Sequence, residues 1–153
     1  MIRTKAIREA LIESLKQSGL FESVTAFNVI DLSQALQTLR DSPDSMAMVV
    51  PARTTYDHEV IAEMDESMPI RCESRAEFEI LLTLRDLSHG DGGALECVDI
   101  MDDLSESLIW SNLGVPGLLC LPQNTEPFVI EIDDRRGREA WKLQVEIVQQ
   151  ITN

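Results

Sequence analysis

The chain is poor in the residues from which metal centres and disulfide frameworks are built. It has two histidines and three cysteines, Cys72, Cys97 and Cys120. Because the cysteines are odd in number and form no CxxC pair, the pattern argues against a disulfide framework and against a structural zinc site. Cys97 and Cys120 stand among apolar residues, so we expect both to be small core side chains.

Long hydrophobic runs, low-complexity tracts and internal repeats are also missing. No apolar run approaches the roughly 18 residues that suffice to span a membrane. The opening stretch MIRTKAIREALIESL carries charges inside its apolar pattern, unlike a secretory signal. With 44% hydrophobic and 26% charged residues, the composition is ordinary for a globular protein. We therefore expect a single soluble domain over residues 1–153, made in a cytoplasm and without a membrane segment.

Basic residues are scarce: 13 stand against 27 acids, and the formal net charge is −14. Since binding to a phosphate backbone rests on clustered Lys and Arg, nucleic acid is not an expected partner. Most of the bases gather near the two ends, as Arg3, Lys5, Arg8 and Lys16, and as Arg135, Arg136, Arg138 and Lys142. Residues 91–106 hold six acids and no base. This segregation either keeps the protein solvated or marks self-association between unlike surfaces.

Hydrophobic spacing predicts two amphipathic helices, over residues 4–18 and 93–112, and a shorter helix over 32–40 with Asp31 as its N-cap. Gly19 is the expected left-handed stop of the first helix. Apolar runs and alternation predict strands over residues 24–30, 46–50, 77–85, 117–122, 128–132 and 141–147.

The acidic segment 52–74 shows weak periodicity and includes Pro69, so we predict a long loop there. A turn at 133–137 joins the last two predicted strands into a long hairpin. Two amphipathic helices need an apolar surface to cover. The pattern therefore predicts an α+β fold, in which a mainly antiparallel sheet ends in this hairpin and both helices pack on one face.

One stretch, RDLSHGDGGALECVDI at 85–100, has the composition of a phosphate cradle with a general base. A Walker loop needs Gly-Lys-Ser/Thr, but Gly92-Gly93 is followed by Ala-Leu, and the spacing does not fit a dinucleotide fingerprint. No GxSxG elbow would present Ser88 to His89. The glycines and an aspartate fit a turn that caps a helix.

Other candidate sites are incomplete. His58-Glu59 does not continue as HExxH, and Asp102 and Asp103 are neighbours that point about 100° apart on a helix. The pair Glu131 and Asp133 lies beside a solvated turn. We predict no catalytic, metal-binding or cofactor-binding residue, and hence no enzyme.

In their order, the predicted elements resemble those of the bacteriophage tail-terminator (minor tail protein) family of lambda-like and Mu-like phages. The segments that carry the resemblance are Thr4–Ser18, Leu32–Arg40 with SPDSMAMVV after it, Glu77–Arg85, Gly93–Asn112 and Phe128–Val148.

The resemblance implies a single tail-terminator-like domain that assembles as a ring, typically a hexamer, on the head-proximal end of the tail tube. Such a ring stops tube growth and offers a surface to head-completion proteins, without catalysis or cofactor. It implies a location in the virion tail, after assembly in the cytoplasm of a bacterial host. The acidic segment 52–74 and the high negative charge depart from the family, so the role of that segment does not carry over.

A head-to-tail ring needs two unlike, complementary surfaces on each subunit. We hypothesise that the hairpin tip, or the basic first helix, of one subunit meets the acidic face of the helix 93–112 of its neighbour. The residues concerned are Arg135, Arg136 and Arg138 at the tip and Asp99, Asp102, Asp103 and Glu106 on the helix. Two alternatives stay open: an acidic adaptor that binds a cationic partner through segment 52–74, and a small hydrolase that uses His89.

Overall fold

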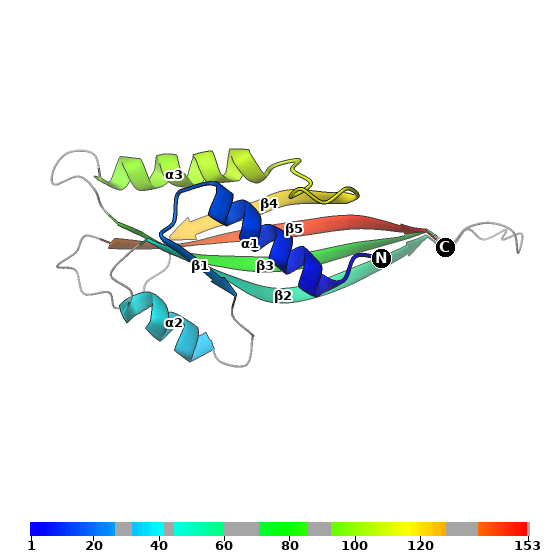
Figure 1. The fold of residues 1–153 in the computed structure, drawn as a ribbon, viewed down its shortest axis with the longest axis horizontal. Coiled ribbons are helices and arrows are strands. Elements are labelled where there is room, and N and C mark those ends of the chain that lie inside the picture. Colours follow the sequence, from blue (N-terminus) through cyan, green and yellow to red (C-terminus); the bar gives the residue numbers. More distant parts are fainter. Residues whose placement is uncertain (27–31, 42–44, 60–70, 86–92, 128–137, 153) are drawn as a thin grey trace, which may run out of the picture.

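The computed structural model describes residues 1–26, 32–41, 45–59, 71–85, 93–127 and 138–152. Within these ranges the chain forms three helices and one five-stranded sheet (Figure 1). The elements are α1 (Thr4–Gln17), β1 (Ser23–Ala26), α2 (Leu32–Asp41), β2 (Met46–Glu59), β3 (Arg71–Arg85), α3 (Gly93–Leu108), β4 (Leu118–Pro127) and β5 (Arg138–Thr152). The predicted α+β class is confirmed.

The sheet has the order β1-β2-β3-β5-β4 and is mixed. β1 runs parallel to β2, whereas β2 with β3, β3 with β5, and β5 with β4 are antiparallel. β3 and β5 pair along their whole length, from Arg71 opposite Thr152 to Arg85 opposite Arg138. Of the predicted closing hairpin, residues 128–137 lie outside the described residues, and the strands that pair with β5 are β3 and β4.

The main core lies between the sheet and the two long helices, α1 and α3, which cover the same face (Figure 1). Alternate residues of β3 point into it, because successive side chains of a strand face opposite sides. The fully buried members include Phe78, Ile80 and Leu82 of β3. They meet Ile7, Leu11 and Leu15 of α1, Cys97, Met101, Leu104 and Leu108 of α3, and Leu143, Val145 and Ile147 of β5.

The opposite face of the sheet is covered over part of its area by α2 (Figure 1). Leu39 of this helix packs in a small second cluster with Met46, Met48, Val50 and Leu81. Elsewhere this face carries charged side chains of β2, β3 and β5, which form cross-strand ion pairs.

The prediction of a loop over 52–74 is wrong at both ends, because 52–59 belong to β2 and 71–74 to β3. The two strands pair in register from Arg53 opposite Glu77 to Glu59 opposite Arg71. Charged side chains alternate here with Thr, Tyr, Ser and Ala, so the apolar alternation of a strand is absent although the backbone is extended. Residues 60–70 lie outside the described part of the chain.

The predicted first helix is confirmed, and Gly19 takes the left-handed conformation after it, with φ 70°. The predicted helix 93–112 is too long, because α3 ends at Leu108. Its continuation is blocked where Trp110 and Leu113 adopt positive φ values of 62° and 54°. None of the described helices is long and apolar enough to span a bilayer.

Candidate interaction surfaces

The described residues contain no cluster of three or more His, Cys, Asp or Glu side chains placed to hold a metal ion. Ser88, His89, Glu131 and Asp133 lie outside the described residues. Of the cysteines, Cys97 and Cys120 are buried in the main core as expected, and none of the three forms a disulfide among the described residues. Burial raises the pKa of the Cys120 thiol to about 12, since a thiolate is poorly solvated there.

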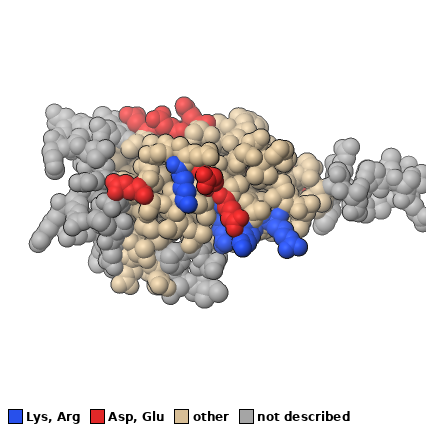
Figure 2. Space-filling view, in the orientation of Figure 1, with Lys and Arg blue, Asp and Glu red and all other residues tan. Residues whose placement is uncertain are grey.

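Acidic side chains gather along the solvent side of α3. Four acids of this helix were proposed for the interface, and all four are described and exposed. We call them the acidic surface: Asp99, Asp102, Asp103 and Glu106. No basic residue occurs between Gly93 and Leu108, and none of the four acids has an ion-pair partner among the described side chains. Figure 2 shows acidic atoms lying together over α3, along its upper edge.

Of the two proposed basic regions, the structure describes one. Arg3, Lys5 and Lys16 are exposed at α1, with Glu9 and Glu13 between the two lysines. Arg135 and Arg136 lie outside the described residues. Arg138 is the first residue of β5, but the structure does not describe its side chain. The contact between the tip and the acidic surface therefore stays a prediction.

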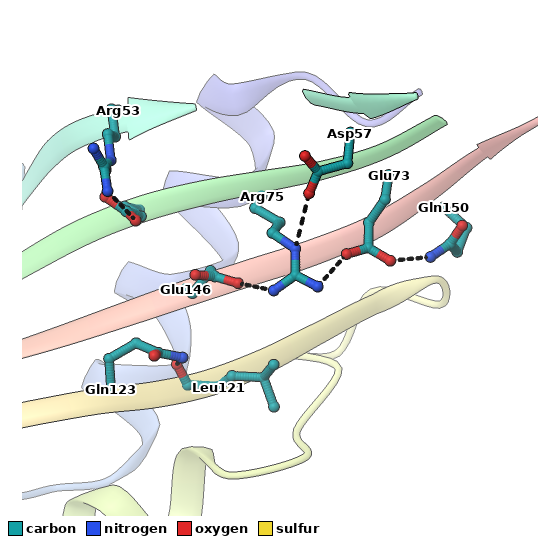
Figure 3. A network of polar contacts seen from close by, with 9 residues as sticks. Arg53, Asp57, Glu73, Arg75, Leu121, Gln123, Glu146 and Gln150 are labelled. Atoms are coloured by element: carbon teal, nitrogen blue, oxygen red, sulfur yellow. Dashed lines mark hydrogen bonds and ion pairs between the residues drawn. The ribbon is translucent and has the colours of Figure 1, made fainter. Parts of the chain in front are cut away.

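On the face of the sheet opposite α1 and α3, by contrast, arginines form ion pairs with acids of the same subunit (Figure 3). Arg53 bonds to Glu77 at 2.6 Å. Arg75 bonds to Glu146 at 2.6 Å, lies 3.6 Å from Asp57 and also contacts Glu73. A bond to a carboxylate raises the pKa of each arginine, because it favours the charged guanidinium.

This matching has a structural reason. Glu77 and Glu146 stand directly opposite each other on β3 and β5, a like-charge pair that destabilises a sheet unless cations lie beside it. Arg53 supplies the cation for the first carboxylate and Arg75 for the second. We therefore assign the charges of this face to the stability of the sheet, and the unmatched charges of α3 to another role.

Exposed apolar side chains accompany the acidic surface. Val98 is 42% exposed on α3, and Ile109 and Trp110, just after its end, are 47% and 69% exposed. Trp110 was not predicted to be a surface contact, because the predicted helix 93–112 includes it, whereas α3 ends at Leu108. The signal that could have found it is its place after Met101, Leu104 and Leu108, the apolar residues at helical spacing that are buried in the core.

Beside Ile109 the surface is hollowed between the end of α3 and β4. The hollow has a volume of about 300 Å³ and is open to solvent. It lies where the register of β4 with β5 shifts between Pro122 and Asn124. Its lining consists of Ser105, Glu106, Ile109, Pro122, Gln123, Asn124 and Thr125.

The sequence matches no protein-family model, and no curated protein is significantly similar to it. The protein has two distinct surfaces. On one face of the sheet, acids and bases of the same subunit form ion pairs. On α3, the surface is acidic and partly apolar, and its four acids have no ion-pair partner among the described residues.

Proposed function

We propose that the protein is a structural component of a phage tail, of the tail-terminator kind. In this proposal copies of the chain form a ring, typically a hexamer, that caps the tail tube and contacts the head-completion proteins. The protein works without catalysis or a cofactor, and it is assembled in the cytoplasm of a bacterial host before it takes its place in the virion. The proposed fold also includes a mainly antiparallel sheet closed by a hairpin within residues 128–148.

The observation that carries the proposal is the contrast between matched and unmatched charge. On the sheet, arginines form ion pairs with carboxylates of the same subunit. On α3, four acids have no cation among the described side chains, and exposed cations stand elsewhere, at α1. A head-to-tail contact needs two unlike surfaces on each subunit. These two surfaces meet that need, and the Arg135–Arg138 tip is the other proposed partner of the acids.

The test begins with the mass of the wild-type protein, measured by light scattering over a wide range of concentrations, alone and with tail tubes, together with negative-stain images. We expect a ring. Asp102→Lys with Asp103→Lys should dissociate it, since like charges would then face each other. Protein that stays monomeric under all these conditions would refute the proposal.

Charge-swap variants then identify the partner. If the tip meets the acidic surface, Arg135→Glu with Arg136→Glu should restore the ring of the lysine variant. If α1 meets it, Arg3→Glu with Lys5→Glu should do so. The control is Ser33→Lys with Gln37→Lys, which adds positive charge to two exposed positions of α2 on the opposite face, and it should leave the mass unchanged.

The alternative of an acidic adaptor acting through segment 52–74 gains no support from the described part of that segment. Asp57 and Glu73 both contact Arg75, and Glu73 also accepts a hydrogen bond from Gln150 at 2.6 Å. Carboxylates that are already bound to a guanidinium within the subunit offer little to a cationic partner.

A further inference from the structure

We infer that Trp110 and the hollow beside it form the apolar centre of a contact between subunits, and that the occupant is the start of α1 of a second copy, around Arg3 and Lys5. This inference rests on the proposed ring and names the site at which one subunit receives the next.

Trp110 combines two features that are unfavourable in an isolated subunit. Its side chain is 69% exposed, the largest exposed fraction among the aromatic side chains described as exposed. Its backbone is left-handed, with φ 62°, a conformation that glycine adopts far more readily than a bulky residue. An exposed tryptophan gains by burial against a partner, and tryptophan is enriched among the residues that dominate binding energy at protein interfaces.

The backbone that presents Trp110 is fixed. Its N–H donates to the carbonyl oxygen of Cys120 at 3.0 Å, and the N–H of Cys120 donates to the carbonyl oxygen of Ser111 at 2.8 Å. Because Cys120 is fully buried in the core, these bonds tie the end of α3 to β4. A side chain held on such a backbone loses less conformational freedom when it binds than one on a free loop.

The hollow that is lined by Ile109, the residue before Trp110, sets the chemistry of the occupant. The hollow offers apolar contact through Ile109 and Pro122, and Glu106 lies in its lining. Asp102 is exposed one helical turn before Glu106. A cationic side chain with an aliphatic stem fits both parts, since its stem can pack on apolar surface while its charge meets a carboxylate or the face of the indole.

Charge complementarity points to α1 as the source of that side chain. Arg53, Arg75 and Lys142 are engaged with carboxylates of their own subunit. Arg3 and Lys5 are exposed, have no ion-pair partner among the described side chains, and precede the first acid of the chain. Within one subunit neither Arg3 nor Lys5 forms an ion pair with an acid of α3 among the described side chains, so we take the cation from a second copy, in a head-to-tail contact.

Fluorescence of Trp110 tests the contact directly. The chain has two tryptophans, so subtracting the spectrum of Trp110→Phe from that of the wild type isolates the signal of Trp110. As concentration rises and rings form, we expect this signal to move to shorter wavelength and its quenching by acrylamide to fall several-fold. Trp110→Ala should weaken assembly by about 10- to 100-fold in dissociation constant. The matched control is Tyr56→Ala, which removes an exposed aromatic side chain from β2 and should have no effect.

The outcomes separate the inference from the proposed function. Rings that form with Trp110 still quenchable, or that form equally well from Trp110→Ala, overturn the inference and leave the ring standing. Wild-type protein that never assembles would contradict both the contact at Trp110 and the proposed ring. The occupant is checked with Arg3→Glu and Lys5→Glu, which should dissociate the ring, and with Glu106→Lys, which should restore it in that background. If rings form without tail tubes and Trp110 becomes protected only when tubes are added, the assignment to a second copy is wrong. Far-UV circular dichroism of each variant must match the wild type.

Discussion

Gln149 fastens the segment before α1 to the sheet, and its removal should be measurable. This residue of β5 is 5% exposed, and its side-chain amide pairs with the backbone of Ile2 in both directions. Oε1 accepts from the N–H of Ile2 at 2.9 Å, and Nε2 donates to the carbonyl oxygen of Ile2 at 2.9 Å. The amide thus imitates the two hydrogen bonds of an antiparallel strand pair.

Gln149→Leu keeps most of the volume of this side chain and removes both hydrogen bonds. A buried hydrogen bond contributes about 0.5–1.5 kcal/mol net, and groups left unpaired add to the loss. Ile2 is half-buried, so water reaches part of its freed backbone. We therefore expect a loss of about 1–3 kcal/mol in the free energy of unfolding. For a chain of this length that corresponds to a fall of roughly 2–10 °C in Tm.

Thermal unfolding followed by circular dichroism measures the loss, and hydrogen exchange at the amides of Ile2 and Ile7 locates it. The matched control is Gln150→Leu, at the next position on the opposite face of the sheet. Gln150 is exposed and bonds to Glu73, so its replacement should change stability by about 0.5 kcal/mol or less. Equal Tm values for the two variants would contradict this expectation, as would unchanged exchange at Ile2 in a destabilised Gln149→Leu.

Two further predictions concern the sheet and the core. Arg53→Glu should lower Tm, because it places a further carboxylate beside Glu77, which already faces Glu146. Adding Glu77→Arg should recover at least half of the loss. A double variant as unstable as the sum of the single variants would contradict the ion pair. Burial raises the pKa of Cys120 to about 12, so the folded thiol stays protonated while the unfolded thiol ionises near its ordinary value of 9.0. The contribution of Cys120 to the free energy of unfolding is therefore complete below about pH 9, and it declines as pH rises toward 12 by up to about 1.4 kcal/mol per pH unit. Urea unfolding at a series of pH values should show a shallower decline for Cys120→Ala than for the wild type. Parallel curves for the two proteins would contradict this expectation.

The elements that could be predicted from the sequence are those with one face buried. Ile7, Leu11 and Leu15 repeat at the spacing of a helix, and all three are in the core. Phe78 and Ile80 alternate with glutamates, and the alternation is found in β3. In both cases the apolar side chains report the period of the backbone without reference to any other segment.

The outer halves of β2 and β3 could not be predicted in that way, because their stabilising partners are distant in sequence. Arg53 pairs with Glu77, 24 residues away, and Arg75 with Glu146, 71 residues away. A sequence pattern registers such residues as solvated charge. Only the register of three strands brings acids and bases together and makes extended backbone stable there.

The end of α3 was misplaced for a related reason. Ile109 and Trp110 continue the apolar composition of the helix, so composition alone extends it. The helix stops because Trp110 bonds to Cys120, a residue of β4 that the sequence does not identify as a neighbour. The exposure of Trp110, and the hollow beside it, follow from that contact and could not be read from the pattern.

Acidic side chains on an exposed helix are by themselves weak evidence for a partner, since water solvates them at little cost. Without exposed apolar side chains nearby, the four acids of α3 would not indicate a contact. What distinguishes them is that the backbone next to them holds an indole in solvent through two hydrogen bonds to the core strand β4. If the surface existed for solubility alone, replacing Trp110 by a small or polar residue would leave assembly intact. If it is a contact, Trp110 and Glu106 should act together, and their combined substitution should cost assembly less than the sum of the separate effects.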